Sequence, residues 1–293
     1  MGSPILRTIM RIVYALVLLS VLSALAAAEV VEEEKDPAAI FGKFTLWSLV
    51  AAYAIYHLGK KSYSKRAYIV SMLLSLLIAG FLLGSEPSSV GVIQDTVLML
   101  ANNTIFPPRF VGLAVFLGFI AVAGRIFCGV CCPFGILQEL SSRLGLNKVK
   151  LPNKAADAVR AAVFVTMVAV TLILSTSFFE PVNPFSVFKR EVLTMQFDHV
   201  EMTAVASGIF SIILSVFVYR PFCRLACPYG FLANLGSKKA RYVLSRDDRC
   251  IECKKCENVC PTGQAGRGHP HTECYYCRKC IEVCPTQAIV LKK

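Results

Sequence analysis

The sequence CIECKKCENVCP at residues 250–261 is followed by CYYCRKCIEVCP at residues 274–285. Both stretches follow one pattern, C-x2-C-x2-C-x3-C-P, so eight of the chain's 13 cysteines gather in its last part. Zinc ribbons normally bind their metal with four ligands arranged as two pairs. Each run here supplies four thiols at a closer, regular spacing with a trailing proline, which favours an iron–sulfur centre over zinc.

Each run has the spacing of the bacterial ferredoxin signature, in which three thiolates hold one cubane and the fourth reaches the neighbouring one. We therefore predict two [4Fe–4S] clusters with crossed ligand sets. One set is Cys250, Cys253, Cys256 and Cys284, and the other is Cys274, Cys277, Cys280 and Cys260. Residues 245–293 are expected to form a small α+β two-cluster ferredoxin domain with a closing strand near Leu291. Crossed ligation places the two clusters close enough for rapid electron exchange.

The rest of the chain has the composition of a membrane protein. Hydrophobic residues make up 55% of its 293 residues and the mean hydropathy is +0.59, whereas soluble domains are roughly 45–50% apolar. Stretches near the length of a bilayer span are residues 9–28, 41–58, 67–84, 110–127, 159–178 and 202–219. Residues 1–28 fit a cleaved signal peptide and a first transmembrane helix equally well. We predict an all-α bundle of five to six transmembrane helices over residues 29–244, with Trp47 in the aromatic belt.

Basic residues are distributed unevenly between the two sides of that bundle. All but five of the 31 Lys and Arg residues fall on one side, which the positive-inside rule makes cytoplasmic. The exceptions are Lys35, Lys43, Arg109, Lys189 and Arg190. All 13 cysteines lie on the basic side, where reducing conditions favour metal or redox chemistry over disulfides. The net charge of +12 then mostly reflects the orientation of the chain in the membrane and not a nucleic-acid partner. We therefore expect membrane lipid and a redox protein as partners, and no nucleic acid.

A second cysteine pattern occurs twice, 95 residues apart. The stretch RIFCGVCCPFGIL at residues 125–137 aligns with RPFCRLACPYGFL at residues 220–232, and each directly follows a predicted span. Cysteines at i and i+4 share a face of a helical turn, so two such pairs can meet around one point: Cys128, Cys132, Cys223 and Cys227. These thiols suit a further iron–sulfur cluster, a redox-active dithiol, or a copper or zinc site. Arg125 and Arg220 either lower the thiol pKa values or anchor the helix ends.

Two CxxxCP motifs after predicted spans, followed by a two-cluster ferredoxin tail, resemble the NapH-type membrane polyferredoxins, which are quinol dehydrogenase subunits. The likeness covers roughly residues 110–293. The wider family includes the membrane regulators of nitrous-oxide reductase and the cytochrome oxidase accessory proteins that reduce cupric ions. The resemblance implies that the four repeat cysteines are functional and that electrons pass between the membrane and another redox protein.

The function that these features predict is a one-electron relay. We expect a multi-pass protein of the inner (cytoplasmic) membrane, with the ferredoxin tail in the cytoplasm, that acts as the electron-transfer subunit of a quinol dehydrogenase in a respiratory chain. Tyr56 and His57 are candidate contacts for a quinone head group, although an interfacial anchoring role is commoner for such residues. The alternative is an accessory protein that reduces cupric ions or a dithiol during assembly of a respiratory metalloenzyme. The sequence indicates no catalytic residue for either function.

Overall fold

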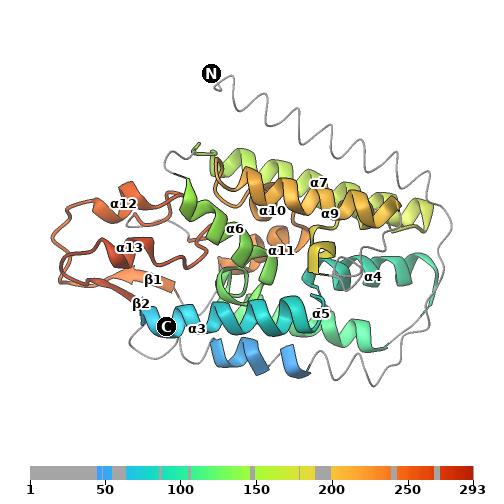
Figure 1. Ribbon diagram of the computed structural model, residues 1–293, viewed down its shortest axis with the longest axis horizontal. Helices are drawn as coiled ribbons and strands as arrows, with labels where there is room; N and C mark the ends of the chain where they lie inside the picture. The colour runs from blue at the N-terminus through green and yellow to red at the C-terminus, as the bar shows by residue number, and fades with distance from the viewer. Residues whose placement is uncertain are drawn as a thin grey trace.

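The computed structural model describes residues 45–47, 49–54, 64–85, 88–104, 107–145, 149–177, 179–188, 199–238, 243–266 and 271–292. The molecule is elongated, with long helices over most of its length and a small cysteine-rich domain at one end (Figure 1). The predicted signal or first span at residues 1–28 lies outside the described residues, as do Tyr56 and His57.

Long helices build the larger part of the fold. They are α3 (Lys65–Leu74), which continues into the wider π-helical turns of η1 (Ser75–Leu82), α4 (Ser89–Ala101), α5 (Pro107–Ala123), α7 (Asn153–Leu174) and α9 (His199–Leu214). Among the described residues, Lys65–Leu82 and α7 are long and apolar enough to cross a membrane. They correspond to the spans expected at 67–84 and 159–178. Because α5 and α9 have only 17 and 16 residues, the bundle of five to six spans stays a prediction.

Helix α4 lies where the sequence pattern indicated an outer connection, between the third and fourth predicted spans. The Ser88 hydroxyl accepts the N–H of Gly91 at 2.9 Å and begins the helix. Val90 and Val92 are fully buried where α4 packs on α5 and α7. With 13 residues, α4 is shorter than a bilayer span requires. A search by span length therefore overlooks it, although its apolar face is part of the core.

Trp47 belongs to the core and not to an interfacial aromatic belt. Its side chain is 4% exposed, and its ring centroid lies 4.9 Å from that of Phe116 and 4.8 Å from that of Phe127. Tyr229 joins the same group through Phe127 at 5.2 Å. The prediction of a belt position was wrong because the helix that carries Trp47 turns this residue toward the neighbouring helices.

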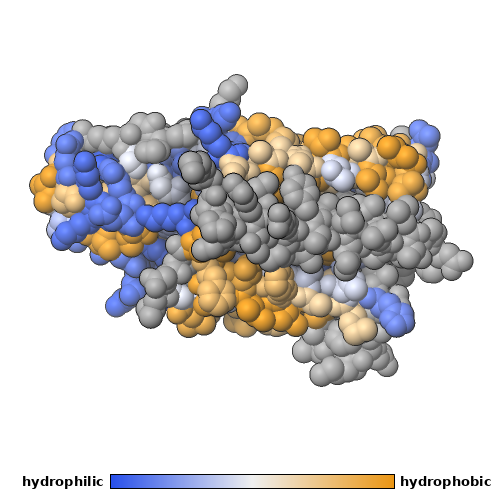
Figure 2. Space-filling view, turned by 90° about the horizontal axis from the view of Figure 1, so that it is seen from above, coloured by the Kyte–Doolittle hydropathy of each residue, from blue (hydrophilic) through white to orange (hydrophobic). Residues whose placement is uncertain are grey.

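Apolar side chains cover the outside of the helical part. Figure 2 shows hydrophobic residues spread over the long helices and hydrophilic residues gathered over the cysteine-rich end. Large apolar side chains that are at least half exposed include Leu49, Leu77, Phe81, Leu82, Val165, Ile173, Ile213 and Phe217. An apolar surface of this extent is typical of a face that contacts lipid or another protein.

Short helices lie between the long helices and the cysteine-rich end and carry the repeated motif. They are η2 (Phe127–Cys131) and α6 (Pro133–Leu144) in the first copy, and α10 (Pro221–Leu225) and α11 (Pro228–Ser237) in the second. Each longer helix starts with a proline at its first position, where the missing N–H costs nothing. Between the copies, the turns η3 (Glu180–Val182) and η4 (Pro184–Phe188) pack on α9.

The cysteine-rich end is a small α+β unit. Strand β1 (Val243–Arg246) pairs antiparallel with β2 (Ile289–Lys292), so that Val243 faces Lys292 and Arg246 faces Ile289. The helices α12 (Lys255–Val259) and α13 (Lys279–Glu282) lie between the strands in the sequence and pack on each other. The closing strand expected near Leu291 is present, and its partner strand begins at Val243.

Candidate functional site

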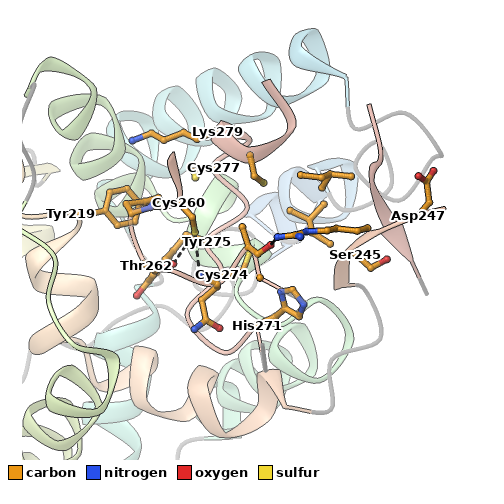
Figure 3. Close-up of a pocket in the computed structure, with 18 of the residues that line it drawn as sticks. Tyr219, Ser245, Asp247, Cys260, Thr262, His271, Cys274, Tyr275, Cys277 and Lys279 are labelled. Atoms are coloured by element: carbon orange, nitrogen blue, oxygen red, sulfur yellow. Dashed lines mark hydrogen bonds between the residues drawn. The ribbon is translucent and has the colours of Figure 1, made fainter. Parts of the chain in front are cut away.

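Four cysteines line one cavity of about 380 Å³ in the tail, and they form the second of the two predicted ligand sets (Figure 3). Cys274, Cys277 and Cys280 come from the second run, and Cys260 comes from the first. Leu244 and Ile289 from the two strands close one part of the same cavity. The structure thus brings a cysteine of one run to the three leading cysteines of the other, as crossed ligation requires.

The two runs fold alike because the same positions adopt left-handed backbone angles. In the first run these are Glu252 (φ 53°) and Lys254 (φ 57°), and in the second they are Tyr276 (φ 54°) and Arg278 (φ 67°). A left-handed residue reverses the local direction of the chain. The alternation wraps each C-x2-C-x2-C segment into a compact loop before its short helix begins.

The fourth cysteine of each run is held by the backbone that follows its proline. The Cys260 sulfur accepts the N–H of Gln264 at 3.2 Å, and the Cys284 sulfur accepts the N–H of Ala288 at 3.3 Å. Although burial acts in the opposite direction, the N–H of Ala288 lowers the pKa of Cys284. Donors aimed at sulfur stabilise thiolates, and hydrogen bonds to the sulfurs tune the potential of a cluster bound there.

The first ligand set lies nearer the surface and does not line that cavity. Cys256 is buried and Cys250 and Cys284 are partly buried, whereas Cys253 is exposed. Burial raises the pKa of Cys256, and the nearby Arg246 offsets only part of this rise. The structure therefore encloses the second set more completely than the first.

The donor sets fit cubanes better than single ions. Each thiolate of a cubane binds a different iron atom, so its four sulfurs surround a space, whereas a mononuclear site needs its ligands to converge on one point. Among the described residues, which include all 13 cysteines, no three His, Cys, Asp or Glu side chains converge on a single ion. Burial raises the pKa of Cys274 to about 12 and that of Cys277 to about 11, so binding a metal there releases protons.

The four repeat cysteines are buried, each with 6 or 7% of its surface exposed. Cys128 lies in η2 and Cys132 begins α6, while Cys223 lies in α10 and Cys227 begins α11. The i, i+4 spacing had predicted that each pair lies on one face of a single helix. In the structure each pair instead lies at the corner between two successive helices. The backbone turns at Cys132 (φ −78°, ψ 114°) and at Cys227 (φ −74°, ψ 116°), since a proline follows.

The glycine after each CP motif fits against the first cysteine of its own copy. A Cβ atom on Gly135 would lie 2.5 Å from the Cys128 carbonyl oxygen, and one on Gly230 would lie 2.9 Å from the Cys223 carbonyl oxygen. Both distances are too short for a side chain. The two copies thus repeat one local structure, and burial raises the pKa of the Cys128 thiol to about 12.

Arg125 and Arg220 form buried ion pairs on the inside of the protein. Arg125 donates to Glu273 at 2.8 Å, to the Tyr275 hydroxyl at 2.8 Å and to the Gly230 carbonyl at 2.9 Å. Arg220 donates to Glu139 at 3.2 Å. Both side chains are buried within the protein, where an anchoring arginine would be exposed, and each one links its own copy of the repeat to another part of the fold.

Glu273, directly before the second cysteine run, lies in a cage of three arginines. Besides Arg125, its carboxylate accepts a hydrogen bond from Arg160 of α7 at 2.6 Å and lies 3.6 Å from the Arg224 Nε. Although burial acts to raise it, the pKa of Glu273 is held below its usual value, first by Arg125 and then by Arg160. The spacing of the cysteines did not reveal this group. A signal was present, because Arg160 is a charge within a predicted apolar span.

The tail contacts the repeat through the backbone beside Cys274. A Cβ atom on Gly129 would lie 2.1 Å from the Tyr275 carbonyl oxygen, so the loop of the second run packs directly on the first CxxxCP motif. The Tyr275 hydroxyl also lies 3.4 Å from the Cys223 carbonyl oxygen, to which it donates. Because Tyr275 also lines the cysteine cavity, one residue connects that cavity with both copies of the repeat.

Comparison with known proteins links both cysteine patterns to iron–sulfur proteins. A 4Fe–4S binding domain family matches residues 105–152 and 201–246, which contain the two copies of the repeat. A second 4Fe–4S binding domain family matches residues 246–264, which contain the first run of the tail. No solved structure matches the chain.

Among curated proteins, the chain is similar to an uncharacterized protein of Methanocaldococcus jannaschii, with 31% identity over 51% of this chain and 63% of that protein. The putative electron transport protein YccM of Escherichia coli is 27% identical over 51% of this chain and 45% of its own length. The methylamine utilization ferredoxin-type protein MauN of Methylobacillus flagellatus is 27% identical over 59% of this chain and 63% of its own length. The chain thus spans less than two thirds of the length of each of these three relatives.

The residues, the paired cysteine patterns and these relatives agree on one class of protein. The chain contains matches to two 4Fe–4S binding domain families and is similar to ferredoxin-type electron transport proteins, consistent with its resemblance to the NapH-type membrane polyferredoxins.

Proposed function

We propose that the protein relays electrons between the quinone pool, or a membrane redox partner, and another oxidoreductase through two [4Fe–4S] clusters in its tail. The observation that carries the proposal is the position of Cys260, which lines one cavity with Cys274, Cys277 and Cys280. Crossed ligation of this kind is the property that distinguishes a two-cluster ferredoxin from two independent metal loops. By the symmetry of the two runs, Cys284 serves the cluster of Cys250, Cys253 and Cys256.

The residues around the cavity hold the cluster and control its surroundings. When bound, a cubane of this type accepts and donates one electron at a time, at a potential set by hydrogen bonds and exposure. The N–H of Gln264 donates to the Cys260 sulfur, while Leu244 and Ile289 contribute apolar lining to the cavity. The more exposed Cys253 places the other cluster nearer to solvent, where a soluble or peripheral partner can approach.

The tail is fixed to the helical part, which favours a short and constant path for electrons. Glu273 and Tyr275 bind Arg125, and the side chain of Asn153 at the start of α7 donates to the Thr262 carbonyl at 2.9 Å. We place the helical part across the inner membrane as a multi-pass unit and the tail in the cytoplasm. The apolar outer surface of the long helices and the basic segments beside the cysteines support this arrangement.

Anaerobic purification followed by iron and sulfide analysis tests the proposal. The tail alone should contribute about eight iron and about eight sulfide ions per chain, with an EPR signal after reduction. The reduced protein should then be reoxidised by a quinone, or the oxidised protein reduced by a quinol. A colourless, EPR-silent protein after oxygen-free reconstitution would overturn the proposal.

The same preparation separates the relay from the accessory-reductase alternative. The buried, paired cysteines of the repeat are the feature that favours the alternative, since thiol pairs bind and reduce copper. Reoxidation of the reduced protein by cupric ions with no response to a quinone would support a metal reductase. Co-purification of an oxidoreductase in a fixed ratio would support the relay.

A further inference from the structure

The repeat cysteines have a matched geometry that the proposed two-cluster relay does not use. Cys128 and Cys223 occupy short helices, and Cys132 and Cys227 begin the helices that follow. The Cys227 sulfur accepts the N–H of Gly230 at 3.4 Å, within the first turn of α11. Sulfur at a helix N-terminus is favoured as an anion, because the free N–H groups and the helix dipole point toward it.

The same four residues share one buried environment made by both halves of the fold. Arg220 of the second copy donates to the Cys128 carbonyl of the first at 2.6 Å, and Arg125 of the first copy donates to the Gly230 carbonyl of the second at 2.9 Å. These crossed hydrogen bonds tie the two motifs together. Phe127 of the first copy and Tyr229 of the second are both buried there, and their ring centroids lie 5.2 Å apart.

The charges around the repeat do not balance within the protein. Four arginines and two glutamates there have side chains with no exposed surface. They are Arg125, Arg160, Arg220, Arg224, Glu139 and Glu273, an excess of two positive charges before the partly exposed Asp157 is counted. Buried charge without a counter-charge is strongly unfavourable. An additional buried anion at this site would therefore be strongly favourable.

Several of these arginines also keep hydrogen-bond donors without a partner. The Nε atoms of Arg125 and Arg160 and the Nη1 atom of Arg224 are buried without a hydrogen-bond partner, and the Nε of Arg224 has only its 3.6 Å ion pair with Glu273. Three of the arginines, Arg125, Arg220 and Arg224, belong to the repeat itself, and Arg160 of α7 donates to the Cys223 carbonyl at 3.4 Å. Unused donors beside four thiols are expected where a bound anion completes the site.

We propose that Cys128, Cys132, Cys223 and Cys227 together hold a third [4Fe–4S] cluster, shared between the two copies of the repeat and enclosed by the arginines. A cubane held by four thiolates carries a net charge of about −2 or −3, which offsets the buried positive excess. Neutral thiols or disulfides would leave that excess in place. The cluster lies beside the tail, since Tyr275 contacts both Gly129 and the Cys223 carbonyl.

Iron and sulfide counts on the anaerobic full-length protein test the proposal. We expect about 12 iron and about 12 sulfide ions per chain, against about eight if only the tail is loaded. Cys223→Ser should lower both counts by about a third and keep the EPR signals of the tail. Cys131→Ser is the matched control, because Cys131 is equally buried but has Ala226 in its place in the second copy. It should retain the full count.

A measurement on the unaltered protein covers the case in which Cys223→Ser fails to fold. Iron-57 Mössbauer spectroscopy should assign all of the iron to cubanes, and thiol titration after anaerobic denaturation should find all 13 cysteines reduced. Three outcomes would each overturn the inference. They are an iron count of about eight in the unaltered protein, a thiol titration that finds four cysteines fewer than 13, and one zinc or copper ion whose binding depends on Cys223. About four iron that survive Cys260→Ser and vanish in Cys223→Ser would instead refute the tail clusters and keep this site.

Discussion

At the scale of single residues, the contact between the tail and the repeat depends on a missing side chain. Gly129 lies so close to the Tyr275 carbonyl that an added Cβ atom would be 2.1 Å away from it. The obstacle is a backbone oxygen and not the flexible end of a side chain. The position therefore admits glycine alone, unless the second cysteine run moves away from the helices.

Gly129→Ala is expected to separate the tail from the repeat. Overpacking of this kind costs about 1–3 kcal/mol, so the tail should become sensitive to limited proteolysis while its iron is retained. Gly118→Ala in α5 is the control, because a Cβ atom there would meet nothing within 4 Å. Equal protease resistance of the two variants would contradict the docking.

Glu273 holds the arginine cage together by charge. Glu273→Gln keeps the size of the side chain but leaves Arg125, Arg160 and Arg224 without their shared carboxylate. Removing one partner of a buried ion group costs about 3–5 kcal/mol, which thermal unfolding in detergent should show as a lowered Tm. Glu282→Gln is the matched control: its carboxylate is 37% exposed and lies 4.0 Å from Arg278, so a change below about 1 kcal/mol is expected.

At the scale of elements, the two cysteine loops depend on left-handed residues as much as on their thiols. Lys254 is exposed and precedes α12 with φ 57°, and Arg278 has the same place before α13 with φ 67°. Neither residue type favours this conformation, and a β-branched side chain opposes it further. The regular spacing of the cysteines is thus effective only when the backbone between them can turn.

Lys254→Ile should therefore loosen the first loop without touching a ligand. A left-handed conformation costs roughly 1–2 kcal/mol for an ordinary residue and more for a branched one, so iron should leave the protein faster in the presence of a chelator. Lys254→Gly should retain iron at least as well as the unaltered protein. Lys255→Ile, at the first helical position of α12, is the control and should lose iron at the rate of the unaltered protein. If it loses iron as fast as Lys254→Ile, the explanation is wrong.

At the scale of the whole molecule, polarity divides the protein along its length. The cysteine-rich end is hydrophilic and the helical part presents apolar side chains outward (Figure 2). Helix α4 does not contribute a full span, yet it packs on α5 and α7 within the helical part. The turn after α4, at Asn102 and Asn103, then lies at the end of the helices that is remote from the tail (Figure 1).

The proposed orientation predicts which surface residues a reagent reaches in whole cells. Asn103→Cys should react with a membrane-impermeant maleimide in intact cells, because this exposed turn lies in the segment expected on the outer side. Lys238→Cys, equally exposed at the end of α11, should react only after the cells are opened. Labelling of Lys238→Cys in intact cells would reverse the orientation.

The iron–sulfur chemistry could be predicted from the sequence because the cysteines that bind one cluster lie mostly within a few residues of one another. The two C-x2-C-x2-C-x3-C-P runs predicted the iron–sulfur class, and the matching 4Fe–4S domain families and relatives confirm it. The repeat was visible for the same reason, and one 4Fe–4S binding domain family matches both of its copies. The ligand assignments and the number of clusters stay predictions.

By itself, the amino-acid sequence determined the ligand chemistry, the internal repeat and the apolar character of the helical part, since each is set by residue type and short-range spacing. Only the tertiary structure decided that Glu273 enters a cage of arginines from three distant segments and that Trp47 faces inward. Such pairings join residues up to 148 positions apart, and they depend on how helices pack. No local pattern encodes that packing, because many partners are sterically possible until the chain has folded.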